Sequence, residues 1–131
     1  MSVQDFEAAV SDVEKKILDA LYQRWVINVN KESGVARWPA MDDYINPCVS
    51  VSRDEIKELA GRDKLRNVFV EKLHENLASR ERIVVEASNG GLRVCIAPGR
   101  AKENEFPTLQ SLQKQNRADI QDDPEVANDP F

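Results

Sequence analysis

Hydrophobic residues recur every three or four positions through the first 28 residues of the chain. This spacing places them on one face of a helix, with charged residues such as Glu7, Asp12 and Glu14 on the solvent side. The residues on this face are Val3, Phe6, Val10, Val13, Ile17, Leu21 and Trp25, followed by the polar Asn28. The pattern predicts a helix of about 27 residues, about 40 Å long. A small domain needs a shorter helix than this to cover its core. We therefore expect the surplus length of the helix to extend past the domain or to pair with another copy.

Shorter elements follow in the middle of the chain. Residues 48–51 indicate a short strand, and Ser52 with Glu55 forms a capping box that opens a second helix, which ends at Gly61. After a turn at residues 62–63, a third helix is predicted to run to about Ser79. Its apolar residues are Leu65, Val68, Phe69, Leu73 and Leu77.

A β-hairpin is predicted next. Residues 82–87 and 92–97 alternate as strands on either side of Asn89-Gly90, a dipeptide typical of a tight hairpin turn. The predicted inward residues are Ile83, Val85 and Ala87 on the first strand and Leu92, Val94 and Ile96 on the second.

Two segments lack such a regular pattern. Residues 35–47 hold two prolines with Trp38 and Tyr44, and we interpret them as an ordered loop lying against the body. Near the C-terminus, a short helix is predicted over 107–117, whereas the acidic, proline-interrupted residues from 119 onward are typical of disorder. The expected organisation is a folded domain over 1–102 and an acidic, largely disordered tail over 103–131.

Charge is unevenly distributed along the 131 residues, a length that suits one compact domain. The net charge of −5 excludes a protein that coats nucleic acid through its global charge. Residues 52–102, however, carry 11 basic and 8 acidic side chains, whereas the segments before and after are net negative. Any contact with a polyanion is therefore expected in the middle segment.

The remaining composition argues against several classes of protein. No apolar run is long enough to span a membrane, and the first residues do not form a secretory signal, so a cytoplasmic location is expected. Cys48 and Cys95 are too few for a disulfide framework and are not spaced as metal ligands, so reduced thiols are expected. Without a phosphate-binding glycine loop, a second histidine or a nucleophile motif, we expect no catalysis, cofactor or metal.

The order of these elements resembles the winged helix-turn-helix domain over about residues 3–98. The expected fold is α+β, with a long N-terminal helix, a short strand, two helices and a hairpin wing. The first helix and the loop at 35–47 are longer than the minimal domain of that family requires, which implies an elaborated variant. That family places its third helix in the major groove of DNA and its wing on the backbone or minor groove. By position, the resemblance implies groove contacts by Arg62, Lys64, Arg66 and Asn67, and wing contacts by Arg82 and Arg93. Arginine and asparagine can make bidentate contacts to guanine and adenine.

The resemblance implies a non-catalytic double-stranded DNA-binding protein, a small regulator or accessory factor of transcription, replication, partition or DNA transfer. Single-domain regulators of this size suit bacteria and their mobile elements. A homodimer through the long first helix would double the phosphate contacts available to one copy.

An adaptor that binds another protein is the alternative. Trp38 and Tyr44 would anchor the partner together with the acidic tail, although such aromatic residues more often fix a loop to its own core. Trp25 fits either the core or a dimer seam. His74, the only histidine, has Glu71 and Glu75 nearby and is expected to be an ordinary surface residue rather than a pH-sensitive contact.

Overall fold

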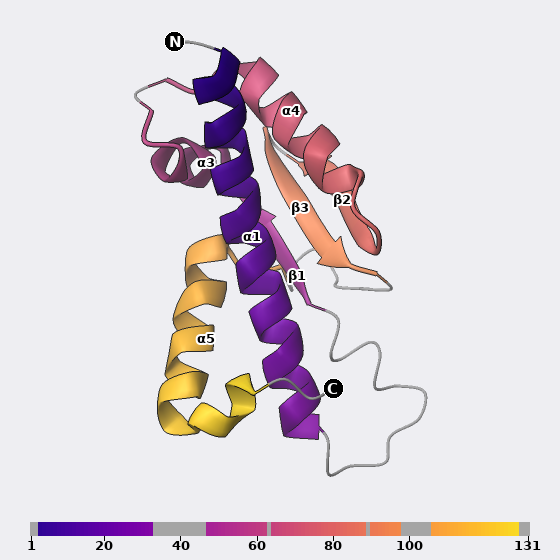
Figure 1. Cartoon of the computed structure of the whole chain (residues 1–131), viewed down its shortest axis with the longest axis vertical. Helices are drawn as coiled ribbons and strands as arrows, with labels where there is room; N and C mark the ends of the chain where they lie inside the picture. The colour runs from indigo at the N-terminus through magenta and orange to yellow at the C-terminus, as the bar shows by residue number, and fades with distance from the viewer. Residues whose placement is uncertain (1–2, 33–46, 63, 89, 98–105, 129–131) are drawn as a thin grey trace.

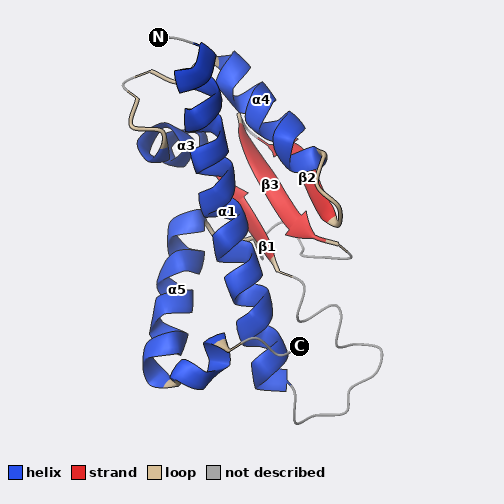
Figure 2. Ribbon diagram, viewed as in Figure 1, coloured by secondary structure: helices blue, strands red, loops and turns tan. Residues whose placement is uncertain are grey.

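The computed structural model describes residues 3–32, 47–62, 64–88, 90–97 and 106–128 as an α+β protein (Figures 1 and 2). Three antiparallel strands form a sheet in the order β1-β3-β2. The elements are α1 (Val3–Glu32), β1 (Cys48–Val51), α3 (Arg53–Leu59), α4 (Asn67–Ala78), β2 (Ile83–Ser88), β3 (Gly91–Ile96), α5 (Leu109–Asp122) and a 3-10 turn, η2 (Pro124–Ala127).

Local sequence signals predicted the middle of the fold correctly. The Ser52 hydroxyl accepts a hydrogen bond from the Glu55 N–H, and the Glu55 carboxylate reaches back to the Ser52 N–H, so the capping box is present. Gly61 follows α3 with φ +64° and Gly90 lies in the hairpin turn with φ +81°, conformations that favour glycine. The predicted register is also confirmed, since β2 residues 83, 85 and 87 lie opposite 96, 94 and 92 of β3, although Ala87 is exposed.

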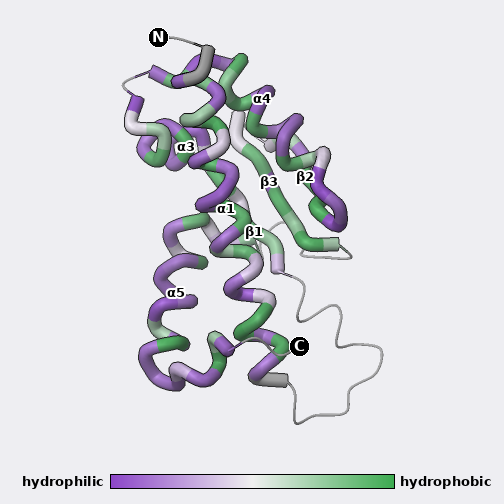
Figure 3. Tube along the Cα trace, viewed as in Figure 1, coloured by the Kyte–Doolittle hydropathy of each residue, from purple (hydrophilic) through white to green (hydrophobic). Residues whose placement is uncertain are grey.

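The N-terminal half of α1 forms the main core with α4 and the sheet. Val10, Val13, Ile17 and Leu21 are completely buried, as the spacing predicted. β3 supplies much of the opposing surface and is largely hydrophobic (Figure 3). The prediction of a solvent-facing Glu14 is wrong.

Glu14 is 5% exposed, and its carboxylate accepts a hydrogen bond from Arg80 Nε at 2.5 Å. Arg80 lies in the connection between α4 and β2, 66 residues away in sequence, so α1 spacing alone gives no sign of this pair.

The C-terminal half of α1 is covered by α5 and η2, which lie alongside it (Figure 1). The predicted short helix is therefore present, but it begins at Leu109, is capped by Thr108 and continues to Asp122. The expected disorder from residue 119 is wrong over the described residues, because Val126 of η2 is buried. Although α5 is mostly hydrophilic, Leu109 and Leu112 are buried (Figure 3).

A buried arginine joins α1 to α5. The Arg24 side chain donates from Nε to Asn116 Oδ1 at 2.7 Å and from Nη1 to Asp119 Oδ2 at 2.7 Å. Asn116, itself completely buried, donates to the Ala20 carbonyl at 3.0 Å. These hydrogen bonds form a polar seam between α1 and the C-terminal segment. Asn30 of α1 extends the seam by donating to the Val126 and Asn128 carbonyls. The polar residues of α5 are thus specific partners of α1.

This packing changes the interpretation of the surplus length of α1. The same chain covers part of the surface that was expected to extend past the domain or to meet a second copy. Trp25 is half-buried and packs against the protein's own core. Within the described ranges, no helix combines the length and apolar character that crossing a membrane requires.

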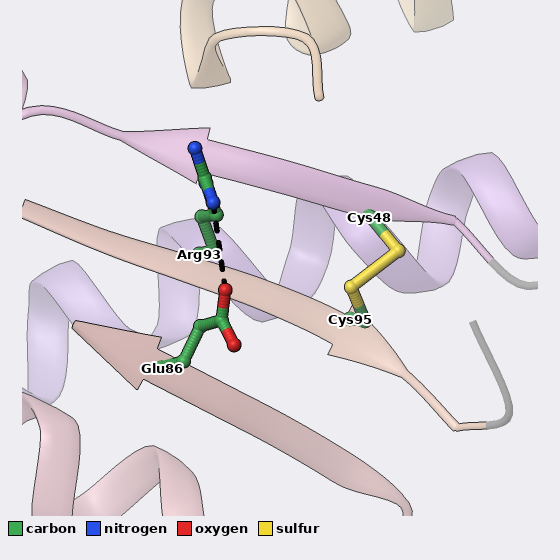
Figure 4. Close-up of a disulfide and its surroundings, with 4 residues drawn as sticks. All are labelled: Cys48, Glu86, Arg93 and Cys95. Carbon is green, nitrogen blue, oxygen red and sulfur yellow. Dashed lines mark ion pairs between the residues drawn. A yellow bond between two sulfur atoms is a disulfide. The ribbon is translucent and has the colours of Figure 1, made fainter. Parts of the chain in front are cut away.

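Cys48 and Cys95 form a disulfide, so the expectation of reduced thiols is wrong for this structure (Figure 4). The two residues lie directly opposite each other on β1 and β3, with Cα atoms 4.0 Å apart. The bond closes a loop across a sequence separation of 47 residues that contains α3, α4 and β2. Two cysteines are enough to form a disulfide in this fold, because the pairing of β1 with β3 brings them together.

Replacing Asn116 with alanine should destabilise the protein by about 1–3 kcal/mol, because Arg24 Nε and the Ala20 carbonyl lose their buried partner. Urea unfolding measures the change. Gln115→Ala, on the exposed side of the same helix, is the matched control and should change stability by less than about 0.5 kcal/mol. Equal effects of the two substitutions would contradict the buried seam.

The double variant Cys48→Ser/Cys95→Ser should lose about 2–4 kcal/mol of unfolding free energy, because the unfolded chain regains the freedom of a long loop. Dithiothreitol should destabilise the wild-type protein to a similar extent and leave the double variant unchanged. A wild-type protein that is equally stable with and without dithiothreitol, and that titrates with two free thiols, would show that the bond does not form.

Candidate nucleic-acid interface

Lys64, Arg66 and Asn67 lie together at the corner between α3 and α4, and all three are exposed. The prediction that they share the outer face of one helix is wrong. Arg66 has an extended backbone, with φ −88° and ψ 149°, and is the N-cap of α4. Lys64 and Arg66 therefore precede the helix, and Asn67 is its first residue. We call these three residues the basic corner.

Arg53, the first residue of α3, braces the basic corner. Its guanidinium donates from Nη1 to Asn67 Oδ1 at 3.0 Å and from Nη2 to the Leu65 carbonyl at 2.6 Å. Its aliphatic stem passes the hairpin turn so closely that a Cβ at Gly90 would meet Arg53 Cδ at 3.2 Å. Sequence analysis missed Arg53, because its position after the Ser52 cap gives no sign of these longer-range contacts.

The N-terminus of α4 differs electrostatically from those of α3 and α5. α3 is capped by Ser52 and has Asp54 and Glu55 in its first turn, and α5 is capped by Thr108. α4 has neither a side-chain cap nor an acidic residue in its first turn. Since helix N-termini attract anions, the basic corner adds its cations to a backbone potential of the same sign.

Arg62 does not belong to the basic corner. Its guanidinium carbon lies 5.1 Å from the centre of the Phe69 ring and 5.9 Å from that of Phe6. The two rings contact each other edge to face with centroids 5.7 Å apart. Arg62 therefore covers the junction between α1 and α4, where cation–π attraction holds it.

The two wing candidates are also separate from the corner. Arg93, on β3, lies 3.5 Å from Glu86 and 5.1 Å from the centre of the Phe106 ring, and its side chain is only 18% exposed (Figure 4). Arg82 is exposed at the start of β2, with φ +67°, and donates to the Ala97 carbonyl at 3.1 Å. It lies at the opposite end of β2 from the hairpin turn, roughly 20 Å along the strand.

The exposed face of α4 beyond Asn67 is not basic. Val68, Glu71 and Glu75 are exposed, and Lys72 lies 3.8 Å from the Glu75 carboxylate. His74 is half-buried on the same helix. The positive charge of this region is therefore concentrated at the start of α4.

Two other features are less specific. An open hollow of about 510 Å³ between α1 and α5 is lined by residues of mixed charge, including Lys16, Asp19 and Arg117. The described residues contain no group of three or more His, Cys, Asp or Glu side chains that could hold a metal ion. Trp38 and Tyr44, the predicted partner anchors, lie outside the described residues.

In comparisons with known proteins, no family model, curated protein or solved structure matches the chain. The functional proposal therefore depends on the chemistry of the basic corner.

Arg62→Ala and Arg66→Ala should differ in their effect on the free energy of unfolding, because Arg62 is packed against two rings and Arg66 is exposed. Removing the Arg62 side chain exposes the Phe6 and Phe69 rings and should cost about 1 kcal/mol of unfolding free energy. Arg66→Ala should change stability by less than about 0.5 kcal/mol, because the side chain makes no cap hydrogen bond. Chemical denaturation of both variants measures this, and a larger loss for Arg66→Ala would contradict the assignment.

Proposed function

We propose that this protein binds double-stranded DNA through the basic corner, without catalysis, as a small regulator or accessory factor of transcription, replication, partition or DNA transfer. The single observation that carries the proposal is the joint exposure of Lys64, Arg66 and Asn67 beside the uncapped N-terminus of α4.

The arrangement of elements supports this proposal. The chain order α1, β1, α3, α4, β2, β3 and the strand order β1-β3-β2 resemble those of a winged helix-turn-helix domain. In that family the helix equivalent to α4 enters the major groove, and contacts gather near its N-terminal end. If this resemblance holds for function, the basic corner would correspond to that contact region, which supports the proposal.

The chemistry of the corner suits a duplex. Lys64 and Arg66 can bind phosphates, and the N-terminal N–H groups of α4 can add to the same contact. Asn67 supplies an amide that can read a base edge. Its hydrogen bond to Arg53 fixes the orientation of that amide before DNA arrives, which lowers the entropy lost on binding.

The placement of negative charge also favours this surface. The acidic C-terminal segment packs along the far half of α1 through α5 and η2, whereas α4 lies at the other end of the molecule (Figure 1). Glu71 and Glu75 lie further along α4, so a duplex is expected to engage the start of the helix rather than its whole length.

Affinity for duplex DNA should fall steeply with added salt, because binding releases counterions from the phosphates. The double variant Lys64→Ala/Arg66→Ala should weaken binding and reduce the slope of log K against log salt by about two units. Fluorescence anisotropy with labelled random and genomic duplexes, begun at low salt, measures both quantities.

Lys114→Ala/Arg117→Ala is the matched control, because it removes the same charge from exposed positions on α5. It should leave both the affinity and the salt slope close to those of the wild type. The proposal is contradicted if neither duplex binds at low salt, or if the two double variants lose affinity equally.

A further inference from the structure

Arg53 determines which end of the Asn67 amide faces solvent. Its Nη1 group donates a hydrogen bond to Asn67 Oδ1 at 3.0 Å. A guanidinium carries donors and no acceptor, so the oxygen of the amide, and not the nitrogen, must be the atom that faces Arg53. The Asn67 Nδ2 group, with its two N–H donors, therefore points away from Arg53.

The Arg53 guanidinium is itself held in place. Its Nη2 group donates to the Leu65 carbonyl at 2.6 Å, and its aliphatic stem lies against Gly90, where a Cβ would meet Arg53 Cδ at 3.2 Å. Arg53 is the first residue of α3, a position where the helix dipole disfavours a cation. The contacts with Asn67 and Leu65 compensate for that position, and they make Arg53 a fixed support for the Asn67 amide.

The outward donors of Asn67 are available to a ligand. Asn67 is exposed at the start of α4, and within the described residues its Nδ2 group has no hydrogen-bond partner. Val68, the next residue, is apolar and 53% exposed, whereas Glu71 in the following turn carries only acceptors. Asn67 therefore supplies neutral side-chain N–H donors at this end of the helix, between the cations of the basic corner and the acidic residues further along α4.

We propose that Arg53 is a specificity-determining positioning residue, which makes Asn67 a donor that reads guanine rather than adenine in the major groove. This inference rests on the proposed DNA binding and adds the base that the basic corner prefers. In the major groove guanine presents two acceptors, N7 and O6, whereas adenine presents the N7 acceptor and the N6 amino donor. An asparagine pairs with both groups of adenine only when its oxygen can accept from N6, and the oxygen of Asn67 already accepts from Arg53.

Electrostatics extend this preference to all four bases. The Asn67 oxygen retains a second lone pair, but an adenine amino group bound there would bring its own positive hydrogens beside the Arg53 cation. The acceptors of guanine are attracted both to the Nδ2 donors and to the nearby Lys64 and Arg66. Cytosine would turn its N4 donor toward the donors of Asn67. The expected order is guanine first, adenine and thymine with one acceptor each next, and cytosine last.

Selection from a library of duplexes randomised over their central base pairs tests the preference of the wild type. Guanine should be enriched at the contacted position, which is the position where Asn67→Ala removes the preference. Replacing that guanine with adenine in the selected duplex should weaken binding by about fivefold or more, the low end of what one base contact contributes. Fluorescence anisotropy with the two duplexes measures the ratio of dissociation constants.

Two substitutions change the donor pattern in opposite ways. Arg53→Met keeps an aliphatic stem and removes the guanidinium, so the freed Asn67 oxygen can accept from adenine and the preference for guanine over adenine should fall to about one. Asn67→Asp, at an exposed position, still accepts from Arg53 but turns an acceptor outward, so the preferred base should change from guanine to cytosine. A purely structural role of Arg53 would instead weaken binding to every duplex by the same factor.

Asn67→Ala is the matched control, because Arg53 acts on the base only through Asn67. In the Asn67→Ala background, Arg53→Met should cause no further change in base preference. If the wild type binds no duplex at low salt, the proposed function is overturned and this inference with it. If the wild type binds, the inference alone is overturned by enrichment of adenine, by the absence of any base preference, or by a guanine preference that persists in Arg53→Met or Asn67→Asp.

Discussion

The buried guanidinium of Arg24 determines where the C-terminal segment of this protein lies. Asn116 and Asp119 of α5 accept hydrogen bonds from its Nε and Nη1, and removing such partners from a buried cation costs several kcal/mol. The seam therefore holds α5 and η2 against α1, although α5 carries few hydrophobic residues. A segment whose composition is typical of a solvated tail becomes part of the folded body.

Two functional consequences follow from this seam. It covers part of the long first helix, and it keeps the acidic segment along one half of α1 while the basic corner lies beside the other half. The corner is also preorganised, because Arg53 connects the start of α4 to α3 and to the hairpin turn. The exposed cations thus project from a braced junction between three elements.

Sequence analysis predicted the features that depend on neighbouring residues. The Ser52 capping box, the strand at 48–51 and the hairpin register all follow from short patterns. It failed to predict contacts between residues that are far apart in the sequence. The buried Glu14 is paired with Arg80, and Cys48 meets Cys95 only when β1 pairs with β3. The start of α4 was misplaced because nothing in the sequence marks the extended backbone of Arg66.

We propose the basic corner as the surface that this protein offers to DNA. Backbone amide chemical shifts, recorded while a short duplex is added, test this proposal. Binding at the corner should give the largest changes on residues 64–68 and leave the amides of α5 nearly unchanged. Changes concentrated on α5 or on the hollow between α1 and α5, or no change at saturating duplex, would contradict it.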